Sequence, residues 1–204
     1  MTASMTSRIE HDRLVPPDRG DRHTESAAPA ECAPPGDYTA LMGMFPTGVA
    51  VITSVDGAGR PHGITCSSLT SVTLSPPTLL VCIRSSSPTL DALMTAGGFA
   101  VNLLHTGASA TATLFGTPVA DRFARVGWRP SATGLPWLHA DALALAECRL
   151  GRAFPVGDHV VVLGEVLTAT RYDGAPLLYG LRQFLPWPAD PGRPAAPANG
   201  ELHD

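Results

Sequence analysis

The sequence predicts a mainly β protein with a few short helices, folded as a small antiparallel barrel with the helices packed outside it. Short apolar or alternating runs recur between Val49 and Leu181, and Gly, Pro and Asp residues bound them. These runs are not separated by regular helices of about 10 to 15 residues, which a parallel βαβ sheet would need. Hydrophobic residues make up 44% of the chain, enough to form a sizeable core. Many short strands with few helices are typical of a barrel.

The composition divides the 204 residues into one domain and two tails. Residues 1–36 are polar and rich in proline, with almost no apolar periodicity, so we expect a disordered N-terminal tail. Residues 186–204 have the same character and predict a flexible C-terminal tail. The folded domain is therefore expected over residues 37–185, an ordinary size for a single domain.

The first half of this domain predicts one helix and three strands. A short amphipathic helix is expected over residues 38–45, ending before a proline. The apolar run VAVITSV over 49–55 predicts a strand, closed by a DGAG turn whose residues tolerate positive φ. The next strand is expected over 64–74 and ends at a Pro-Pro pair, since proline cannot donate to a β ladder. The run TLLVCIR over 78–84 is typical of a buried strand.

The second half begins with a helix whose boundaries the sequence marks well. Ser87-Pro88 is a favourable cap and first turn, Asp91 lies near the positive end of the helix, and Gly97-Gly98 ends it. The remaining expected elements are a strand over 99–104, short helices over 109–115 and 121–126, and strands over 142–154, 160–170 and 177–181.

Charge and cysteine content exclude several classes of function. The net charge is −4 and the basic residues are scattered, whereas nucleic-acid binding needs clustered Lys and Arg. The four cysteines lie far apart, which disfavours a zinc site, and we expect no metal. No run is long enough to span a membrane, and the N-terminus lacks the apolar core of a signal peptide, so we expect a cytoplasmic protein. Neither a GxGxxG fingerprint after a strand nor a P-loop occurs.

Two hydroxyl-rich segments are candidates for binding a polar ligand. Residues 63–71, GITCSSLTS, form a strand that could hold a flat heteroaromatic ring by hydrogen bonds, although a solvent-facing strand has the same composition. Residues 84–89, RSSSPT, lead into a helix, where free backbone N–H groups and serine hydroxyls suit an anion such as phosphate. The same Ser87 also serves as an ordinary helix cap.

Among the seven histidines, His159 has the most suggestive position. It follows Gly157-Asp158 in a turn between two predicted strands, where Asp158 could fix the orientation of the imidazole. A polar turn residue without function fits the same pattern. Near the start of the domain, Thr47 and Gly48 offer a hydroxyl and an open backbone at the beginning of the first strand.

Taken in order, these segments resemble the flavin reductase family of FMN-binding split-barrel proteins, the short-chain reductase components of two-component flavin-dependent monooxygenases. The resemblance covers about residues 38–185. The matching segments are FPTGVAVIT at 45–53, HGITCSS at 62–68, SVTLSPP at 71–77, FAVNLL at 99–104, DRF at 121–123, GDH at 157–159, GEV at 164–166 and PLLY at 176–179.

The resemblance implies a homodimer of split barrels that binds FAD or FMN near the subunit interface. His159, as the catalytic residue, would contact NADH or NADPH, with Asp158 and Tyr179 near the same site. The residues implied for the flavin are Thr47, Gly48, Thr65, Cys66, Ser67 and Ser68 around the ring, Ser85, Ser86 and Thr89 at the phosphate, and Asn102 at the border of the pocket. Cys66 departs from the family, which often has Asn or a small residue there.

The function implied is an NAD(P)H:flavin oxidoreductase that supplies reduced flavin to a partner monooxygenase or halogenase. Hydride transfer between stacked rings needs orientation more than acid–base chemistry, so His159 is expected to position the hydride donor. Because the same fold hosts other functions, a flavin-binding protein without reductase turnover is an alternative. A pyridoxamine-phosphate-oxidase-like enzyme is a third, although more Arg and Lys would be expected in its pocket.

Overall fold

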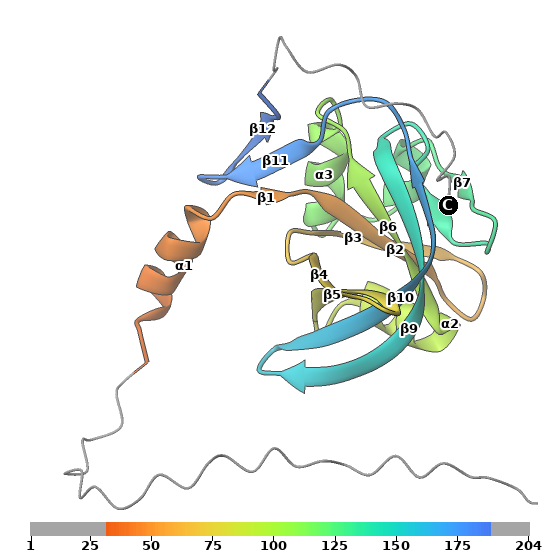
Figure 1. The fold of residues 1–204 in the computed structure, drawn as a ribbon, viewed down its shortest axis with the longest axis horizontal. Helices are drawn as coiled ribbons and strands as arrows, with labels where there is room; N and C mark the ends of the chain where they lie inside the picture. The colour runs from red at the N-terminus through yellow and green to blue at the C-terminus, as the bar shows by residue number, and fades with distance from the viewer. Residues whose placement is uncertain (1–31, 189–204) are drawn as a thin grey trace, which may run out of the picture.

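The computed structural model describes residues 32–188 and confirms a mainly β, antiparallel fold with few helices (Figure 1). Seven strands form one antiparallel sheet in the order β3-β2-β6-β9-β10-β5-β4. Its strands are β2 (Ala50–Val55), β3 (Pro61–Cys66), β4 (Thr70–Leu74), β5 (Pro77–Arg84), β6 (Gly98–Leu104), β9 (Ala142–Val156) and β10 (His159–Arg171).

Two small sheets and three helices complete the described part of the fold. One sheet has the order β1-β11-β12, and the other pairs β7 with β8. The strands are β1 (Thr47–Gly48), β7 (Arg129–Pro130), β8 (Pro136–Trp137), β11 (Leu177–Gly180) and β12 (Gln183–Pro186). The helices are α1 (Pro35–Gly43), α2 (Pro88–Ala96) and α3 (Ser109–Gly116), with a short 3-10 turn, η1 (Arg122–Arg125).

The core lies between the curved sheet and the helices that pack on it. One cluster of buried side chains, which includes Ile52, Leu93 and Phe99, joins the sheet to α2. A second, which includes Val51, Phe115 and Leu138, joins it to α3 and to the loops that follow α3. Helix α2 packs mainly on β2, and α3 on β3. Strand β3 therefore lies against α3 and also contacts α2.

Helix α2 has the capping that its sequence predicts. Ser87 is the N-cap and its hydroxyl accepts a hydrogen bond from the Thr89 N–H, 3.3 Å away. Pro88 begins the helix, and Gly97 ends it with a left-handed backbone at φ 69°. The predicted helices over 109–115 and 121–126 are found as α3 and η1.

Some predicted boundaries are wrong. The single strand expected over 64–74 is two strands, because the chain leaves β3 after Cys66 and turns before β4 begins at Thr70. The strand expected over 177–181 ends at Gly180. Leu181 and Arg182 then adopt positive φ, and the hairpin returns as β12. The short strands β7 and β8 were not predicted.

The predicted tails lie largely outside the described residues. Helix α1 begins at Pro35, inside the tail predicted over 1–36, and β12 ends at Pro186, the first residue of the tail predicted over 186–204. The rest of both tail predictions concerns residues 1–31 and 189–204, which the structure does not describe. Between residues 32 and 188, no helix is long and apolar enough to cross a membrane.

Candidate functional site

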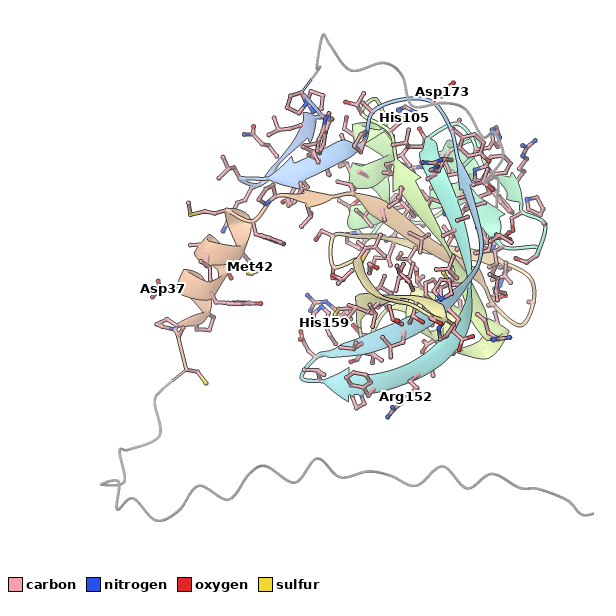
Figure 2. All side chains as sticks on the ribbon, in the orientation of Figure 1. Asp37, Met42, His105, Arg152, His159 and Asp173 are labelled. Atoms are coloured by element: carbon pink, nitrogen blue, oxygen red, sulfur yellow. The ribbon has the colours of Figure 1, made fainter. Side chains whose placement is uncertain are left out.

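The turn at Gly157-Asp158 places His159 at the first position of β10 (Figure 2). The β ladder pairs His159 with Arg84 at the end of β5. Gly157 has φ 59°, a left-handed conformation that favours glycine in such a turn. The Asp158 carboxylate lies between the two side chains, with Oδ1 2.7 Å from His159 Nδ1 and Oδ2 3.5 Å from Arg84 Nη1. One carboxylate therefore orients both side chains.

The ionised form of Asp158 is stabilised by His159 and Arg84. The hydrogen bond and the charge of His159, followed by the charge of Arg84, hold the pKa of the Asp158 carboxyl below its ordinary value. Asp158 therefore stays ionised and fixes Nδ1 of the imidazole, since a hydrogen bond at one ring nitrogen sets the role of the other. The His159 side chain is 40% exposed, so Nε2 remains available to a ligand.

His159 borders a small pocket of about 270 Å³, which we call the small pocket. Its other residues come from the end of β3, the following turn and the end of β5: Ile64, Thr65, Cys66, Ser67, Ser68, Cys82, Ile83 and Arg84. The structure thus brings together the hydroxyl-rich strand and the histidine turn, which lie about 90 residues apart in the sequence.

Within the small pocket, most side-chain hydroxyls are used by the fold. The Thr65 hydroxyl donates to the Ala112 carbonyl at 2.6 Å. The Ser68 hydroxyl accepts from the Cys82 N–H at 2.9 Å and donates to the Cys82 carbonyl at 3.2 Å. Cys66 is buried, and this burial raises the pKa of its thiol. Ser67 is exposed, so a ligand would meet its hydroxyl and the backbone of the turn.

A larger pocket of about 800 Å³ adjoins the small pocket, and the two share Ile64 and Arg84 in their walls. We call it the large pocket. It lies between β3, the N-terminus of α2 and the segment from Phe115 to Ala124. Ser86 and Thr89, both predicted at a phosphate, line it. Ser85 does not; it is exposed, and its backbone N–H donates to the Asp158 carbonyl at 2.9 Å.

Three of the predicted site residues, Thr47, Gly48 and Tyr179, lie together away from both pockets. Thr47 and Gly48 lie in β1, where Thr47 pairs with Tyr179 and Gly48 with Leu178 of β11. The Thr47 hydroxyl is buried with no hydrogen-bond partner in the described part of the chain. Tyr179 packs against Phe184, with ring centroids 5.1 Å apart. None of the three lines either pocket, so within one chain they are not brought together with His159.

Asn102, predicted at the border of the flavin pocket, lies in the buried core. Asn102 is fully buried, and its amide nitrogen donates to the Val51 carbonyl at 3.2 Å and the Thr53 hydroxyl at 3.1 Å. Its carbonyl accepts from the Leu138 N–H at 2.9 Å. These bonds tie β6 to β2 and to the segment after β8, and Asn102 lines neither pocket.

Three arginines line the pockets, Arg60, Arg84 and Arg122, and the sequence predicted a role for none of them. Arg84 lines both pockets, and its position opposite His159 depends on strand pairing that only the fold reveals. Arg122 lies in the DRF segment, which is one of the segments that resemble the family. This resemblance could have identified Arg122 as a pocket residue. It lines the large pocket beside Phe123.

Comparison with known proteins places this geometry in a family. Residues 42–188 match the family model of the flavin reductase like domain. A flavin reductase (NADPH) of Lentzea aerocolonigenes is 55% identical over 152 residues, covering 74% of this chain and 89% of that protein. A flavin reductase (NADH) of Kitasatospora aureofaciens is 44% identical over 156 residues, covering 75% and 82% of the two chains.

Solved structures agree with these sequence matches. The NADH:FAD oxidoreductase of Streptomyces globisporus, in complex with NAD and FAD fragments, matches with a TM-score of 0.71 and 35% identity, over 79% of this chain and 99% of that one. The flavin reductase component of a bacterial two-component tryptophan halogenase matches with a TM-score of 0.69 and 34% identity, over 76% and 99%. The chain therefore belongs to the flavin reductase family of split-barrel proteins.

Proposed function

We propose that the chain is an NAD(P)H:flavin oxidoreductase that reduces FAD or FMN and supplies reduced flavin to a partner monooxygenase or halogenase. The observation that carries the proposal is the position of His159 at the rim of the small pocket, oriented by Asp158 and facing the end of β3. An oriented, partly exposed imidazole beside a polar turn suits the binding of two stacked rings better than it suits hydrolysis.

The donors of the two pockets fit a flavin. The turn after β3 offers backbone groups and the Ser67 hydroxyl, which can hydrogen-bond the heteroatoms at the rim of an isoalloxazine. The Ser86 hydroxyl and the N-terminus of α2 lie in the adjoining large pocket, where a helix N-terminus and free hydroxyls suit a phosphate. Arg84 lies between the two places and can neutralise the negative charge.

When bound, flavin accepts the hydride that the reduced nicotinamide nucleotide donates. The residues of this chain provide orientation for that step. Asp158 holds His159 Nδ1, so the imidazole presents Nε2 in a fixed direction. The reaction moves a hydride between rings at near-attack distance, so it needs His159 as a positioning group and not as a proton carrier.

The assignment of nucleotide and partner rests on the relatives. The relatives named above include one NADPH-dependent and one NADH-dependent reductase, so either nucleotide is compatible with the family. A reductase component of a tryptophan halogenase and one of a styrene monooxygenase are among the structural matches. An oxygenase or halogenase as the recipient of reduced flavin follows from these matches and is part of the proposal.

The proposal includes a homodimer. Helix α1 buries none of its residues, and Figure 1 shows it standing apart from the barrel. Tyr38, Leu41 and Met42 are spaced as one helix face and are 60%, 64% and 44% exposed. A second copy of the chain is the partner we propose for this face. The cytoplasmic location is part of the same proposal, since the reaction consumes reduced nicotinamide nucleotide.

The test is an oxidation assay of the purified chain with NADH or NADPH, with FAD and FMN added in separate reactions. We expect loss of reduced-nicotinamide absorbance that depends on added flavin. A chain that binds flavin but oxidises neither nucleotide would be a flavin-binding protein without turnover, and the proposed activity would be wrong.

A further inference from the structure

A third pocket shares no residue with the small and large pockets, and the proposed function makes no use of it. Its volume is about 420 Å³, within the range of about 300 to 1,000 Å³ that is usual for small-molecule sites. We call it the aromatic pocket. Its residues come from β7, β8, the loop between them, and the adjoining parts of β9 and β10: Arg129, Pro130, Ser131, Ala132, Trp137, Leu145, Glu147, Thr170 and Tyr172.

The fold holds the walls of the aromatic pocket in place. Strands β7 and β8 pair with each other and form one wall. The loop between them is closed by a hydrogen bond from the Ser131 N–H to the Leu135 carbonyl at 2.8 Å. The Pro136 carbonyl on β8 accepts a hydrogen bond from the buried Thr53 hydroxyl at 2.6 Å, which ties β8 to the core. The pocket is therefore preformed, and a ligand would not have to order it.

Two stacked rings line the aromatic pocket. Trp137 and Tyr172 lie with their ring centroids 5.6 Å apart and their planes at 13°. Arg129 Cζ lies 4.1 Å from the Trp137 ring centroid, and this cation–π contact holds the guanidinium at the pocket. Tyr172 is 40% exposed, so part of its ring remains open to the ring of a ligand.

Two opposite charges line the same pocket without pairing. Among residues 32–188, Arg129 forms no ion pair. Burial would raise the pKa of Glu147, but hydrogen bonds from neighbouring hydroxyls outweigh this effect and keep the carboxylate ionised. In the described part of the chain, Glu147 Oε1 accepts three hydrogen bonds, whereas Oε2 accepts one, from the Thr168 hydroxyl at 2.8 Å. Oε2 therefore has a lone pair free for a further donor.

A ligand with a single charge does not suit this arrangement. A simple anion at the guanidinium of Arg129 would also face the Glu147 carboxylate, and a simple cation would face Arg129. A zwitterion offers each of the two groups a partner of opposite charge, which is the arrangement that electrostatic complementarity favours. An aromatic body on the same ligand would use the open part of Tyr172.

We propose that the aromatic pocket binds an aromatic α-amino acid in its zwitterionic form. Its carboxylate pairs with the Arg129 guanidinium, whose planar fork matches carboxylate geometry. Its ammonium group donates to Glu147 Oε2, and its ring packs against Tyr172. The inference does not depend on the proposed function, because the pocket shares no residue with the two pockets assigned to flavin.

Isothermal titration calorimetry of the full chain with L-phenylalanine tests the proposal. We expect one site per chain with a Kd below about 1 mM, both in the absence of flavin and in the presence of saturating FAD. Absence of binding at about ten times that concentration would overturn the inference. Displacement of L-phenylalanine by FAD would do the same, because it would place the amino acid in the flavin site.

Two analogues test the two charges without any variant. The compound 3-phenylpropanoate lacks the ammonium group, and 2-phenylethylamine lacks the carboxylate. Each should bind at least about tenfold more weakly than L-phenylalanine, a difference of about 1.4 kcal/mol, because it leaves one charged group of the pocket without a partner. A Kd for either analogue equal to that for L-phenylalanine would contradict the zwitterion.

Arg129→Gln tests the carboxylate contact directly. It should raise the Kd for L-phenylalanine about tenfold and should not raise the Kd for 2-phenylethylamine, which has no carboxylate. Arg129→Lys keeps the charge and should cause a smaller rise for L-phenylalanine.

Arg125→Gln is the matched control, since Arg125 is an exposed arginine of η1 that lines none of the three pockets. It should bind L-phenylalanine as the wild type does. Equal Kd values for L-phenylalanine in Arg129→Gln and Arg125→Gln would overturn the inference. If Arg129→Gln does not fold, the two analogues with the wild-type chain decide between the outcomes.

Discussion

At the scale of single residues, the site depends on one carboxylate that serves two neighbours. Asp158 fixes the imidazole of His159 and pairs with Arg84, and all three groups are partly exposed. An exposed ion pair contributes little to stability, about 0 to 1 kcal/mol. Replacing one of these groups should therefore change the free energy of unfolding little. The role of the arrangement is to orient the His159 ring.

The first prediction concerns His159→Ala. We expect the KM for the nicotinamide nucleotide to rise about tenfold while kcat falls less than about twofold, because the side chain orients the hydride donor and transfers no proton. Steady-state kinetics at saturating flavin measures this. His139→Ala is the control, since His139 is an exposed histidine that lines neither pocket. A fall in kcat with an unchanged KM would show that His159 acts in the chemical step.

The sequence predicted which residues meet at the site better than it predicted what each side chain does there. Thr65 to Ser68 and His159 were expected together and line one pocket. The Ser68 hydroxyl, however, is bonded to Cys82, and the amide of Asn102 is bonded inside the core. Hydrogen-bond partners that lie 14 or 51 residues away depend on strand register, which local patterns do not contain.

At the scale of elements, the ends of helices and strands could be predicted from the sequence wherever a capping or turn residue sets them. Ser87 and Gly97 mark both ends of α2 as expected. The break after Cys66 was missed because residues 64–74 show no proline or glycine at the point where the strand ends. The turn at this break is held by a tertiary contact, the hydrogen bonds between the Ser68 hydroxyl and the Cys82 backbone, and it lines the small pocket.

The loop between β7 and β8 is held in place by the buried carboxylate of Glu147. Glu147 on β9 is 4% exposed and accepts hydrogen bonds from the hydroxyls of Ser131, Thr133 and Thr168 and from the Thr133 N–H. Burial alone would raise its pKa, but these hydrogen bonds outweigh that effect and lower it. Glu147 thus anchors the loop between β7 and β8 to the main sheet.

We predict that Glu147→Gln lowers the free energy of unfolding by about 1 to 3 kcal/mol at about pH 7, since several of these bonds are to a charged acceptor. A lowered folded-state pKa stabilises the protein above the unfolded value of 4.5, and this stability is lost as the pH falls through the folded value. The difference between wild type and Glu147→Gln should therefore shrink below about pH 4.

Urea unfolding across this pH range measures the effect. Glu165→Gln is the matched control, because Glu165 lies on the neighbouring strand β10 and forms a more exposed pair with Arg149. It should change stability by less than about 1 kcal/mol. A difference between wild type and Glu147→Gln that stays constant with pH would show that the carboxylate charge does not stabilise the loop.

At the scale of the whole molecule, apolar side chains remain exposed in several places. Helix α1 stands apart from the barrel with Met42 on it, and His159 lies at the edge of the barrel on the same side of the molecule (Figure 2). Other exposed apolar side chains are Val72 and Leu74 on β4 and Phe154 and Val156 at the end of β9. The proposed homodimer would bury exposed apolar side chains of this kind.

The last prediction tests whether that surface joins two copies of the chain. The wild type should sediment at twice the chain mass of 21.2 kDa, and Leu41→Glu should sediment as a monomer, because a charge on the apolar face of α1 would be desolvated at the interface. Ala40→Glu is the control, since position 40 lies on the opposite face of the same helix. Sedimentation velocity distinguishes the two species directly. A wild-type monomer, or equal dissociation of both variants, would contradict the proposed interface, and the apolar face of α1 would then be left to bind the oxygenase component.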